Sequence, residues 1–359
     1  MRLLVIKLEA LGDVLRTTAL LSPIKARRPD MEIWWLTSKA ARPLIESNPM
    51  VDRALHWCPR DLAALKTVRF NRVLCMEEDP KCAALRHSVL HGMWTGVCPG
   101  GYSADSAPFY DMSLLNAATN GDCSVPDALK RANRFSYEEI WLSIIGLNPE
   151  TPLTPSLFVS EEEKDKAAAL LDGLFSDARG PRFAINPGAG KRWRSKRIPD
   201  GLVLEISRAA ARKFGAPLLL LGGPEEAREH PALAAASRGN LLYAGAGHSL
   251  TQFAAIIREL DGLISTDSLA LHTAKAVRTP VVGLFGPTSA AEVKINLGTA
   301  LRAEECGCFY RSNCNAPEPC LGRIPASLVV NALKSLDAGD RRTRRQCAEL
   351  AESPASARR

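Results

Sequence analysis

Short apolar segments, each ending in a turn of small or polar residues, recur along this chain and constrain its fold more than any other feature. In the second half the segments span 182–186, 216–221, 262–266 and 280–285. They end at Pro187-Gly188, Gly222-Gly223-Pro224, Asp267-Ser268 and Gly286-Pro287-Thr288. Buried parallel strands read as such apolar runs, and open α/β sheets bind ligands beyond the carboxyl ends of their strands. The pattern therefore predicts a doubly wound α/β domain with a ligand site at these turns.

The first half of the chain shows the same alternation of strands and helices. Strands are expected over 3–8, 32–37, 72–76 and 93–97. Helices are expected from Val14, with a kink or restart near Pro23, and over 137–147. Residues 99–135 lack periodicity, which predicts an irregular surface excursion.

The prolines at 149, 152 and 155 form a stiff linker between the two halves. We therefore expect an N-terminal domain over 1–152 and a C-terminal domain over 153–336. The charged residues 337–359 are expected to form a disordered basic tail. A length of 359 residues with 46% hydrophobic residues suits two such domains.

The composition limits where the protein can act. No stretch approaches the roughly 20 apolar residues of a membrane span, and the N-terminus lacks the pattern of a secretion signal. We therefore expect a cytoplasmic protein that could touch the cytoplasmic face of a membrane. The net charge of +7 suits an anionic partner, although it fits a solvated basic surface equally well. No recognised nucleic-acid-binding module is present, so we expect no nucleic-acid partner.

A glycine and a carboxylate, Gly12-Asp13, follow the first expected strand. Gly12 permits a tight turn and a close approach of a ligand to the backbone. Asp13 could act as a general base on an acceptor hydroxyl, or it could cap the helix that follows.

A basic glycine-rich loop follows the strand at 182–186. It contains Gly188 and Gly190 and then five cations over 191–197. Backbone N–H groups and cationic side chains of this kind suit a polyphosphate, although the spacing is not that of a Walker A loop. The alternative is a solvated basic loop.

A second anion site is expected where the strand at 262–266 runs into a helix. Asp267 and Ser268 stand at the helix start, and His272 follows Ser268 by four residues, which places both on one face. The alternative for His272 is a residue buried in the core.

Four of the ten cysteines cluster near the C-terminus with the spacing C-x-C-x5-C-x5-C, namely Cys306, Cys308, Cys314 and Cys320. Four thiolates form a reasonable structural zinc site. Because C-x-C is not the usual spacing of a zinc knuckle, reduced thiols or a redox-linked pair remain alternatives.

Three of these segments together resemble glycosyltransferase family 9, the ADP-heptose:lipopolysaccharide heptosyltransferases. The resembling segments are VIKLEALGDVLRTTALL, NPGAGKRWRSKRIPD and STDSLALHTAKAVRTPVVGLFGPTSAAE. The cysteine cluster resembles one in some longer members. The resemblance implies a GT-B fold, in which two Rossmann-like doubly wound domains face a central cleft. It also implies an inverting transfer without a catalytic metal or cofactor, from a nucleotide sugar, by default ADP-heptose, to a glycolipid or glycan acceptor.

The resemblance also implies roles for individual residues. Asp13 matches the catalytic base, and Gly12, Lys7 and Arg16 beside it could meet the acceptor. The donor site would include Lys196 near the phosphates, Ser268 and His272 at the helix start, and Asp267 fixing that turn. Four further residues complete the donor set. Gly188, Gly286 and Thr288 follow strand ends, and the Glu225 carboxylate could contact the nucleoside or sugar.

Three other functions compete with this interpretation. A dinucleotide-dependent oxidoreductase would need G-x-G-x-x-G after the first strand, and that motif is absent. A GT-B enzyme using another nucleotide sugar, including an epimerase, and a noncatalytic anion-binding protein are the alternatives. Leu269 and Ile198 replace the usual Gly and Trp of the family at the donor site, which leaves the identity of the sugar open.

Overall fold

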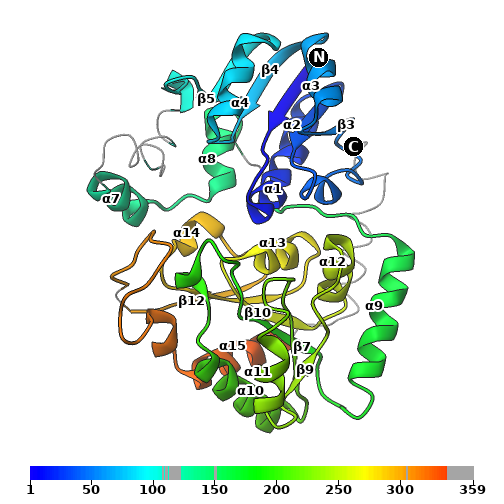
Figure 1. The fold of residues 1–359 in the computed structure, drawn as a ribbon, viewed down its shortest axis with the longest axis vertical. Helices are drawn as coiled ribbons and strands as arrows, with labels where there is room; N and C mark the ends of the chain where they lie inside the picture. The colour runs from blue at the N-terminus through cyan, green and yellow to red at the C-terminus, as the bar shows by residue number, and fades with distance from the viewer. Residues whose placement is uncertain (107–108, 110–111, 113–122, 149–151, 305, 338–359) are drawn as a thin grey trace. The chain divides into compact units, whose positions relative to one another are not determined.

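The computed structural model describes residues 1–106, 109, 112, 123–148, 152–304 and 306–337 (Figure 1). The chain divides into two compact units, the first reaching Leu157 and the second beginning at Phe158. The expected linker prolines at 152 and 155 lie just before this division. Residues 338–359, which make up all but the first of the expected tail, lie outside the described part of the chain.

A six-stranded sheet forms the centre of the first unit (Figure 1). Its strands lie in the order β3-β2-β1-β4-β5-β6, and all neighbours are parallel except β5 and β6. The strands are β1 (Arg2–Ile6), β2 (Glu32–Thr37), β3 (Arg53–His56), β4 (Arg69–Cys75), β5 (Leu90–Cys98) and β6 (Gly101–Tyr102).

Helices connect these strands and cover the sheet. They are α1 (Leu11–Thr17), α2 (Leu21–Arg27), α3 (Pro59–Lys66), α4 (Pro80–Ala84), α7 (Ser124–Ala132) and α8 (Tyr137–Ile144), with 3-10 turns η1 (Thr18–Leu20), η2 (Arg42–Leu44), η3 (Leu85–His87) and η4 (Ala104–Ser106). The restart expected near Pro23 is confirmed, since Pro23 lies in the first turn of α2, where its missing N–H is tolerated. The expectation of an irregular segment over 99–135 is wrong in part, because α7 is a regular helix within it.

The strand β1 is buried on both faces, as its apolar run predicts. Leu4 and Ile6 pack in one cluster with residues of α3 and α4. Leu3 and Val5 are also buried and, by strand alternation, face the opposite side of the sheet.

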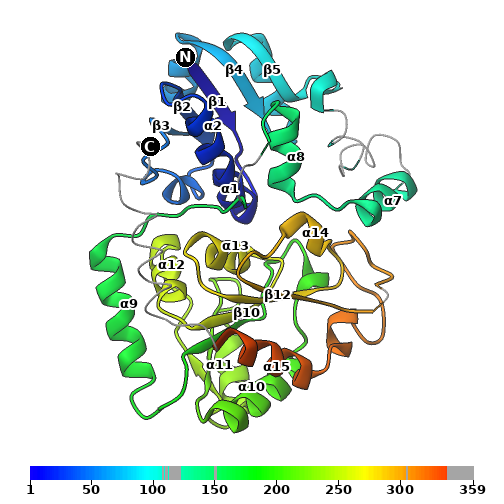
Figure 2. The same cartoon turned by 180° about the vertical axis from the view of Figure 1, so that it is seen from behind.

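The second unit is built around a six-stranded sheet with parallel pairing throughout (Figure 2). Its strands lie in the order β12-β11-β10-β7-β8-β9. They are β7 (Phe183–Asn186), β8 (Leu218–Leu220), β9 (Leu241–Tyr243), β10 (Gly262–Thr266), β11 (Val281–Phe285) and β12 (Gly298–Arg302).

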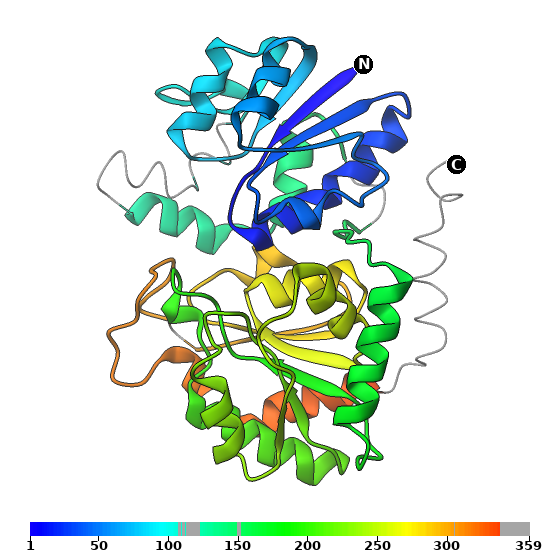
Figure 3. The ribbon, with the colours of Figure 1, turned by 45° about the vertical axis from the view of Figure 1, so that its right-hand side comes forward.

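Helices cover both faces of this second sheet (Figures 2 and 3). Helices α10 and α15 pack together on one face, and α9, α12 and α13 pack in series on the other. The bounds of these helices are α9 (Glu161–Leu174), α10 (Asp200–Phe214), α12 (Leu250–Arg258), α13 (Leu269–Ala276) and α15 (Ala326–Asp337). Two shorter helices, α11 (His230–Ala236) and α14 (Ala290–Val293), and two 3-10 turns, η5 (Arg194–Lys196) and η6 (Cys320–Arg323), complete the unit. Helix α9 begins with the expected serine cap, because Ser160 and Glu163 form a capping box.

Both sheets share one topology, which positions a ligand site in each. In chain order each reads 3-2-1-4-5-6, the order of a Rossmann-like doubly wound domain. The direction of winding reverses between the first and fourth strands, β1 and β4 in one unit and β7 and β10 in the other. Ligands bind beyond the carboxyl ends of strands at such a switch point. The prediction of two doubly wound α/β domains is confirmed.

Candidate functional site

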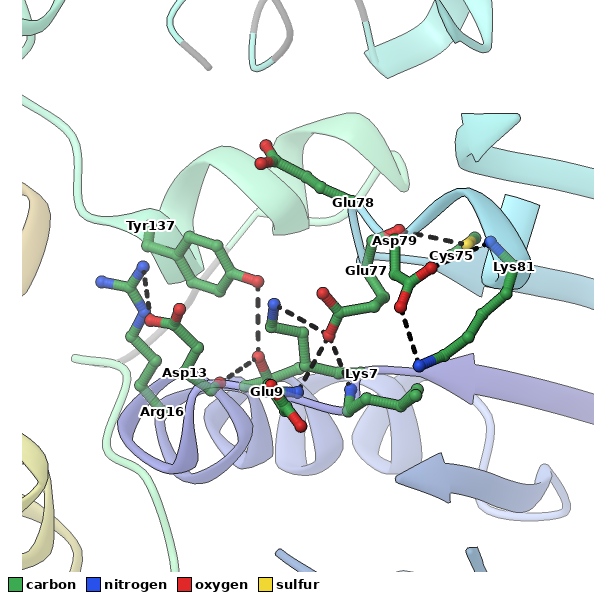
Figure 4. A network of polar contacts seen from close by, with 12 residues as sticks. Lys7, Glu9, Asp13, Arg16, Cys75, Glu77, Glu78, Asp79, Lys81 and Tyr137 are labelled. Carbon is green, nitrogen blue, oxygen red and sulfur yellow. Dashed lines mark hydrogen bonds and ion pairs between the residues drawn. The ribbon is translucent and has the colours of Figure 1, made fainter. Parts of the chain in front are cut away.

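The switch point of the first unit carries an ion pair between residues that follow β1 and β4 (Figure 4). Lys7 Nζ lies 3.4 Å from Glu77 Oε2. The same Glu77 oxygen accepts hydrogen bonds from the backbone N–H groups of Leu8, at 2.8 Å, and Glu9, at 2.9 Å. One carboxylate therefore fixes the whole turn that leads from β1 into α1.

Asp13 is the third residue of α1 and not its cap. The N-cap position is Ala10, which offers no side-chain hydrogen bond. The Asp13 carboxylate instead forms an ion pair with Arg16, with 3.1 Å between Oδ1 and Nη2. The Asp13 side chain is 37% exposed whereas that of Arg16 is 13% exposed, so the base candidate remains accessible to a substrate while its partner is largely buried. Gly12, the second residue of the helix, is half-buried.

Tyr137, the first residue of α8, holds Arg16 in place (Figure 4). The Arg16 guanidinium lies over the Tyr137 ring, 3.9 Å from its centroid, which is the geometry of a cation–π contact. Burial raises the pKa of Tyr137 to about 12, so the phenol is neutral at physiological pH. It accepts a hydrogen bond from Thr17 Oγ1 at 3.4 Å.

Lys7 is a buried cation that stays charged. Burial alone disfavours an ammonium group, but the nearby charges of Asp13 and Glu77 outweigh this effect, and the pKa of Lys7 is raised. Asp13 therefore lies in the field of two cations, Lys7 and Arg16.

The switch point of the second unit carries a three-residue polar cluster, formed where β7 and β10 end. Lys196, in the turn η5 after β7, places Nζ 2.8 Å from Asp267 Oδ2. His272, on α13, places Nε2 3.4 Å from Asp267 Oδ1. Each oxygen of one carboxylate thus meets a different side chain. The structure brings together three residues that the family resemblance assigns to the donor site, including Asp267, which is expected to fix the turn.

Asp267 is ionised in this setting despite its burial. Burial opposes its charge, but Lys196 and the hydrogen bond from His272 lower its pKa well below the usual value. Asp267 is thereby able to hold both partners, which supports its expected role in fixing the turn. The alternative for His272 is a residue buried in the core. His272 is indeed buried, with 3% of its surface exposed, but its ring also contacts this polar cluster.

Ser268 joins the same turn as the N-cap of α13, without a side-chain hydrogen bond to the helix. Its hydroxyl lies 3.1 Å from that of Ser265 and 3.5 Å from Asn186 Nδ2. Asn186 also donates to the carbonyl of Gly188 at 3.0 Å. Asn186 therefore links the glycine-rich loop to the start of α13, a connection that its own sequence context does not reveal.

Two adjacent glutamates brace the glycine-rich loop. Glu225 Oε2 accepts a hydrogen bond from the backbone N–H of Lys191 at 2.6 Å. Glu226 accepts one from Gly223 at 2.9 Å and lies so close to Gly188 that a Cβ there would come within 2.5 Å of Glu226 Oε1. A Cβ at 188 would therefore require the Glu226 side chain to move. The sequence singled out Glu225 but not Glu226.

The remaining expected donor residues follow β11. Thr288 is buried. Gly286 also has a packing reason to be glycine, since a Cβ there would lie 2.4 Å from the Sγ atom of Cys320. All the expected donor residues therefore lie in the second unit, after strands β7, β8, β10 and β11, and the expected base and acceptor residues lie in the first.

Two groups among the described residues have the side chains to hold a metal ion. One comprises Cys306, Cys308 and Cys320, and the other comprises His56, Cys58 and Asp61. Cys314, the fourth member of the expected cluster, lines one pocket with the first group. Within the described part of the chain, no helix has the length and apolar character needed to cross a bilayer.

Comparisons with known proteins agree with this architecture. A model of glycosyltransferase family 9 (heptosyltransferase) matches residues 62–315. Lipopolysaccharide heptosyltransferase 2 of Salmonella typhimurium (strain LT2) is 26% identical over 314 residues, covering 80% of this chain and 84% of that protein. A family 9 glycosyl transferase structure from Veillonella parvula superposes with a TM-score of 0.69 at 15% identity, covering 93% of this chain and 96% of the other. The E. coli ADP-heptose lps heptosyltransferase II structure gives 0.67 at 20% identity, covering 94% and 98%.

Proposed function

The chain belongs to glycosyltransferase family 9, the heptosyltransferase family, and from this premise we propose that it transfers heptose from ADP-heptose to a lipopolysaccharide-core or related glycan acceptor. The choice of donor and acceptor is supported by the names of its relatives, a lipopolysaccharide heptosyltransferase 2 and an ADP-heptose heptosyltransferase II. The observation that carries the proposal is the Lys196–Asp267–His272 cluster at the switch point of the second sheet.

The cluster suits a leaving nucleoside diphosphate. When the bond from the sugar to the diphosphate breaks, negative charge grows on the phosphate oxygens. Lys196 supplies a cation, and the start of α13 supplies free backbone N–H groups with the Ser268 hydroxyl beside them. Asp267 holds Lys196 and His272 before the donor arrives, so little reorganisation is needed during the reaction. These groups supply a cation and hydrogen-bond donors to the leaving phosphates from the chain itself, which fits a transfer without a catalytic metal.

Asp13 supplies the base for the acceptor. Its carboxylate removes the proton from the acceptor hydroxyl as that oxygen forms a bond to the anomeric carbon. The bond from the anomeric carbon to the diphosphate oxygen breaks at the same time, and its electron pair leaves with ADP. A single displacement of this kind inverts the anomeric configuration. Lys7 and Arg16 lie on either side of Asp13 and suit acidic groups on the acceptor.

Calorimetry with a panel of nucleotides tests the donor assignment. ADP-heptose, ADP-glucose, UDP-glucose and ADP are titrated into the wild-type chain and two lysine variants. We expect selective binding of ADP-heptose and ADP. Lys196→Met should weaken ADP binding by about tenfold to a hundredfold, the usual cost of a lost charge-assisted contact.

Lys213→Met is the matched control. Lys213 lies on α10 of the same unit and its side chain is exposed, so we expect binding to change less than about twofold. Preference for another nucleotide sugar would retain glycosyl transfer but change the donor. Absence of binding by every nucleotide would contradict the proposal.

A further inference from the structure

Four cysteines gather in the segment between β12 and α15, which follows in sequence all the residues assigned to the reaction. Cys306 Sγ lies 3.2 Å from Cys308 Sγ and 3.5 Å from Cys320 Sγ. All three sulfur atoms lie within 4.8 Å of one another. Cys314 contacts the Cys308 thiol, and the four residues line one pocket. None of them forms a disulfide.

The chemistry of this cluster favours a metal ion. Thiols are weak hydrogen-bond donors, so packing several together in a partly buried pocket satisfies them poorly. A thiophilic cation would convert them to thiolates and bind all of them. In a tetrahedral site with Zn–S bonds of about 2.3 Å, the sulfur atoms lie about 3.8 Å apart. The distances here approach that arrangement. Arg311 and Arg323 line the same pocket and would offset the net negative charge of a four-thiolate site.

The cysteine segment also supports the turn that carries Lys196. Ser195 donates its backbone N–H to the carbonyl of Ser312 at 3.0 Å and its hydroxyl to the carbonyl of Arg311 at 2.6 Å. These two acceptors lie between the second and third cysteines. Trp193 and Tyr310 add an edge-to-face ring contact with centroids 6.5 Å apart.

A second turn of the donor site rests on the same segment. The backbone N–H of Tyr310 donates to the carbonyl of Pro287 at 2.7 Å. Gly286 faces Cys320 so closely that no Cβ would fit. The segment therefore connects the turn after β7 to the turn after β11. Any ligand that fixes the four sulfur atoms also fixes these two turns.

We propose that the four cysteines bind one tetrahedral transition-metal ion, Zn²⁺ or Fe²⁺, which holds the segment that positions Lys196. Tetrahedral thiolate sites suit both ions. The ion is structural, and no step of the transfer passes through it. The predicted metal content does not depend on the proposed function. The predicted effect of the metal on ADP binding through Lys196 does rest on that function.

Metal analysis of the full chain tests the site. The protein is purified without oxygen and without chelators, and its zinc and iron are measured by mass spectrometry. We expect about one ion per chain in the wild type, close to none in Cys308→Ser, and an unchanged value in Cys58→Ser. The last variant is a matched control because Cys58 belongs to the other candidate group.

A second measurement keeps the test valid if Cys308→Ser fails to fold. Cobalt is exchanged into the wild-type chain, and its visible absorption is recorded. Intense sulfur-to-cobalt bands typical of tetrahedral thiolate coordination are expected. A metal-free wild type with reduced thiols, disulfides between these cysteines, or loss of the ion in Cys58→Ser would each overturn the site.

ADP affinity tests the positioning of Lys196. The metal is removed from the wild type with a chelator, the retained fold is checked by circular dichroism, and ADP is titrated by calorimetry. We expect ADP binding to weaken about tenfold, in the range found when a supporting contact is lost, and to recover when zinc is returned. Unchanged ADP affinity after verified metal removal would overturn the positioning role. Loss of ADP binding by the metal-loaded protein itself would instead count against the proposed function.

Discussion

Individual residues in this protein show how burial and charge set a protonation state. Asp267 is buried and ionised because Lys196 and His272 hold its two oxygens. His230 shows the opposite balance. Its side chain is 1% exposed, its Nδ1 finds no hydrogen-bond partner among the described residues, and burial lowers its pKa to about 4.

His230 predicts how the stability of the protein depends on pH. Because the folded pKa is lower than the unfolded value of 6.5, the unfolded chain binds more protons between pH 6.5 and pH 4. Stability should therefore be lost as pH falls through this window, by about 2 to 3 kcal/mol from this one group. Urea unfolding at pH 7.5, 6, 5 and 4 measures the effect.

Two variants isolate the contribution of His230. His230→Leu has no charge to bury, so its stability should change less with pH over the same window. His87→Leu, at an exposed histidine, should keep the wild-type slope. Equal pH slopes for the wild type and His230→Leu would show that the buried imidazole does not titrate as described.

At the scale of elements, the turn from β1 to α1 depends on one residue distant in sequence. Glu77 follows β4 and accepts the backbone N–H groups of Leu8 and Glu9. In Glu77→Ala both N–H groups lose their partner, and Lys7 loses a counter-ion. We expect a loss of about 2 to 4 kcal/mol in unfolding free energy, measured in urea, and slower transfer.

Glu77→Gln should recover part of that stability, because its amide oxygen still accepts the backbone bonds. Glu78→Ala is the control, since the neighbouring Glu78 accepts one hydrogen bond from Tyr102, at 3.0 Å. We expect it to cost less than about 1 kcal/mol. If Glu78→Ala destabilised the protein as much as Glu77→Ala, the turn would not depend on Glu77 in particular.

The elements that the sequence predicted are those buried on both sides. The strands at the centres of the two sheets are continuous apolar runs, and all eight predicted strands occur, those at 32–37 and 262–266 with the predicted bounds and the others with shifted ends. Four strands were missed, namely β3, β6, β9 and β12. Each lies at the edge of its sheet, where a strand is short or half exposed and carries no long apolar run.

The candidate site was predictable where strand ends or the family pattern marked it. Lys196, Asp267 and His272 meet as predicted, but their roles in donor binding stay predictions. Glu77 carried a usable signal, because three acidic residues follow the predicted strand at 72–76. Tyr137 carried none, since its contact with Arg16 depends on how α8 packs. The capping alternative for Asp13 is wrong because α1 begins before it.

At the scale of the whole molecule, one topology occurs twice with different chemistry at its switch point. In both sheets the strands, numbered in chain order within each unit, lie in the order 3-2-1-4-5-6. The first places an accessible carboxylate between two cations there, and the second places a cation and a histidine on one buried carboxylate. These are the complementary requirements of glycosyl transfer: a base for the acceptor and positive charge for the leaving diphosphate. Each unit thus supplies one half of the proposed reaction.

The role of Asp13 is the central claim of this account, and one paired measurement tests it most directly. Transfer of heptose from ADP-heptose to a lipopolysaccharide-core acceptor and calorimetric binding of ADP are measured for the wild type and Asp13→Asn, with the exposed Asp30→Asn as control. We predict that Asp13→Asn loses about a thousandfold in kcat, typical of a missing general base, while ADP affinity changes less than about twofold. Near-normal turnover by Asp13→Asn would contradict the account, because the carboxylate would then serve only to hold Arg16.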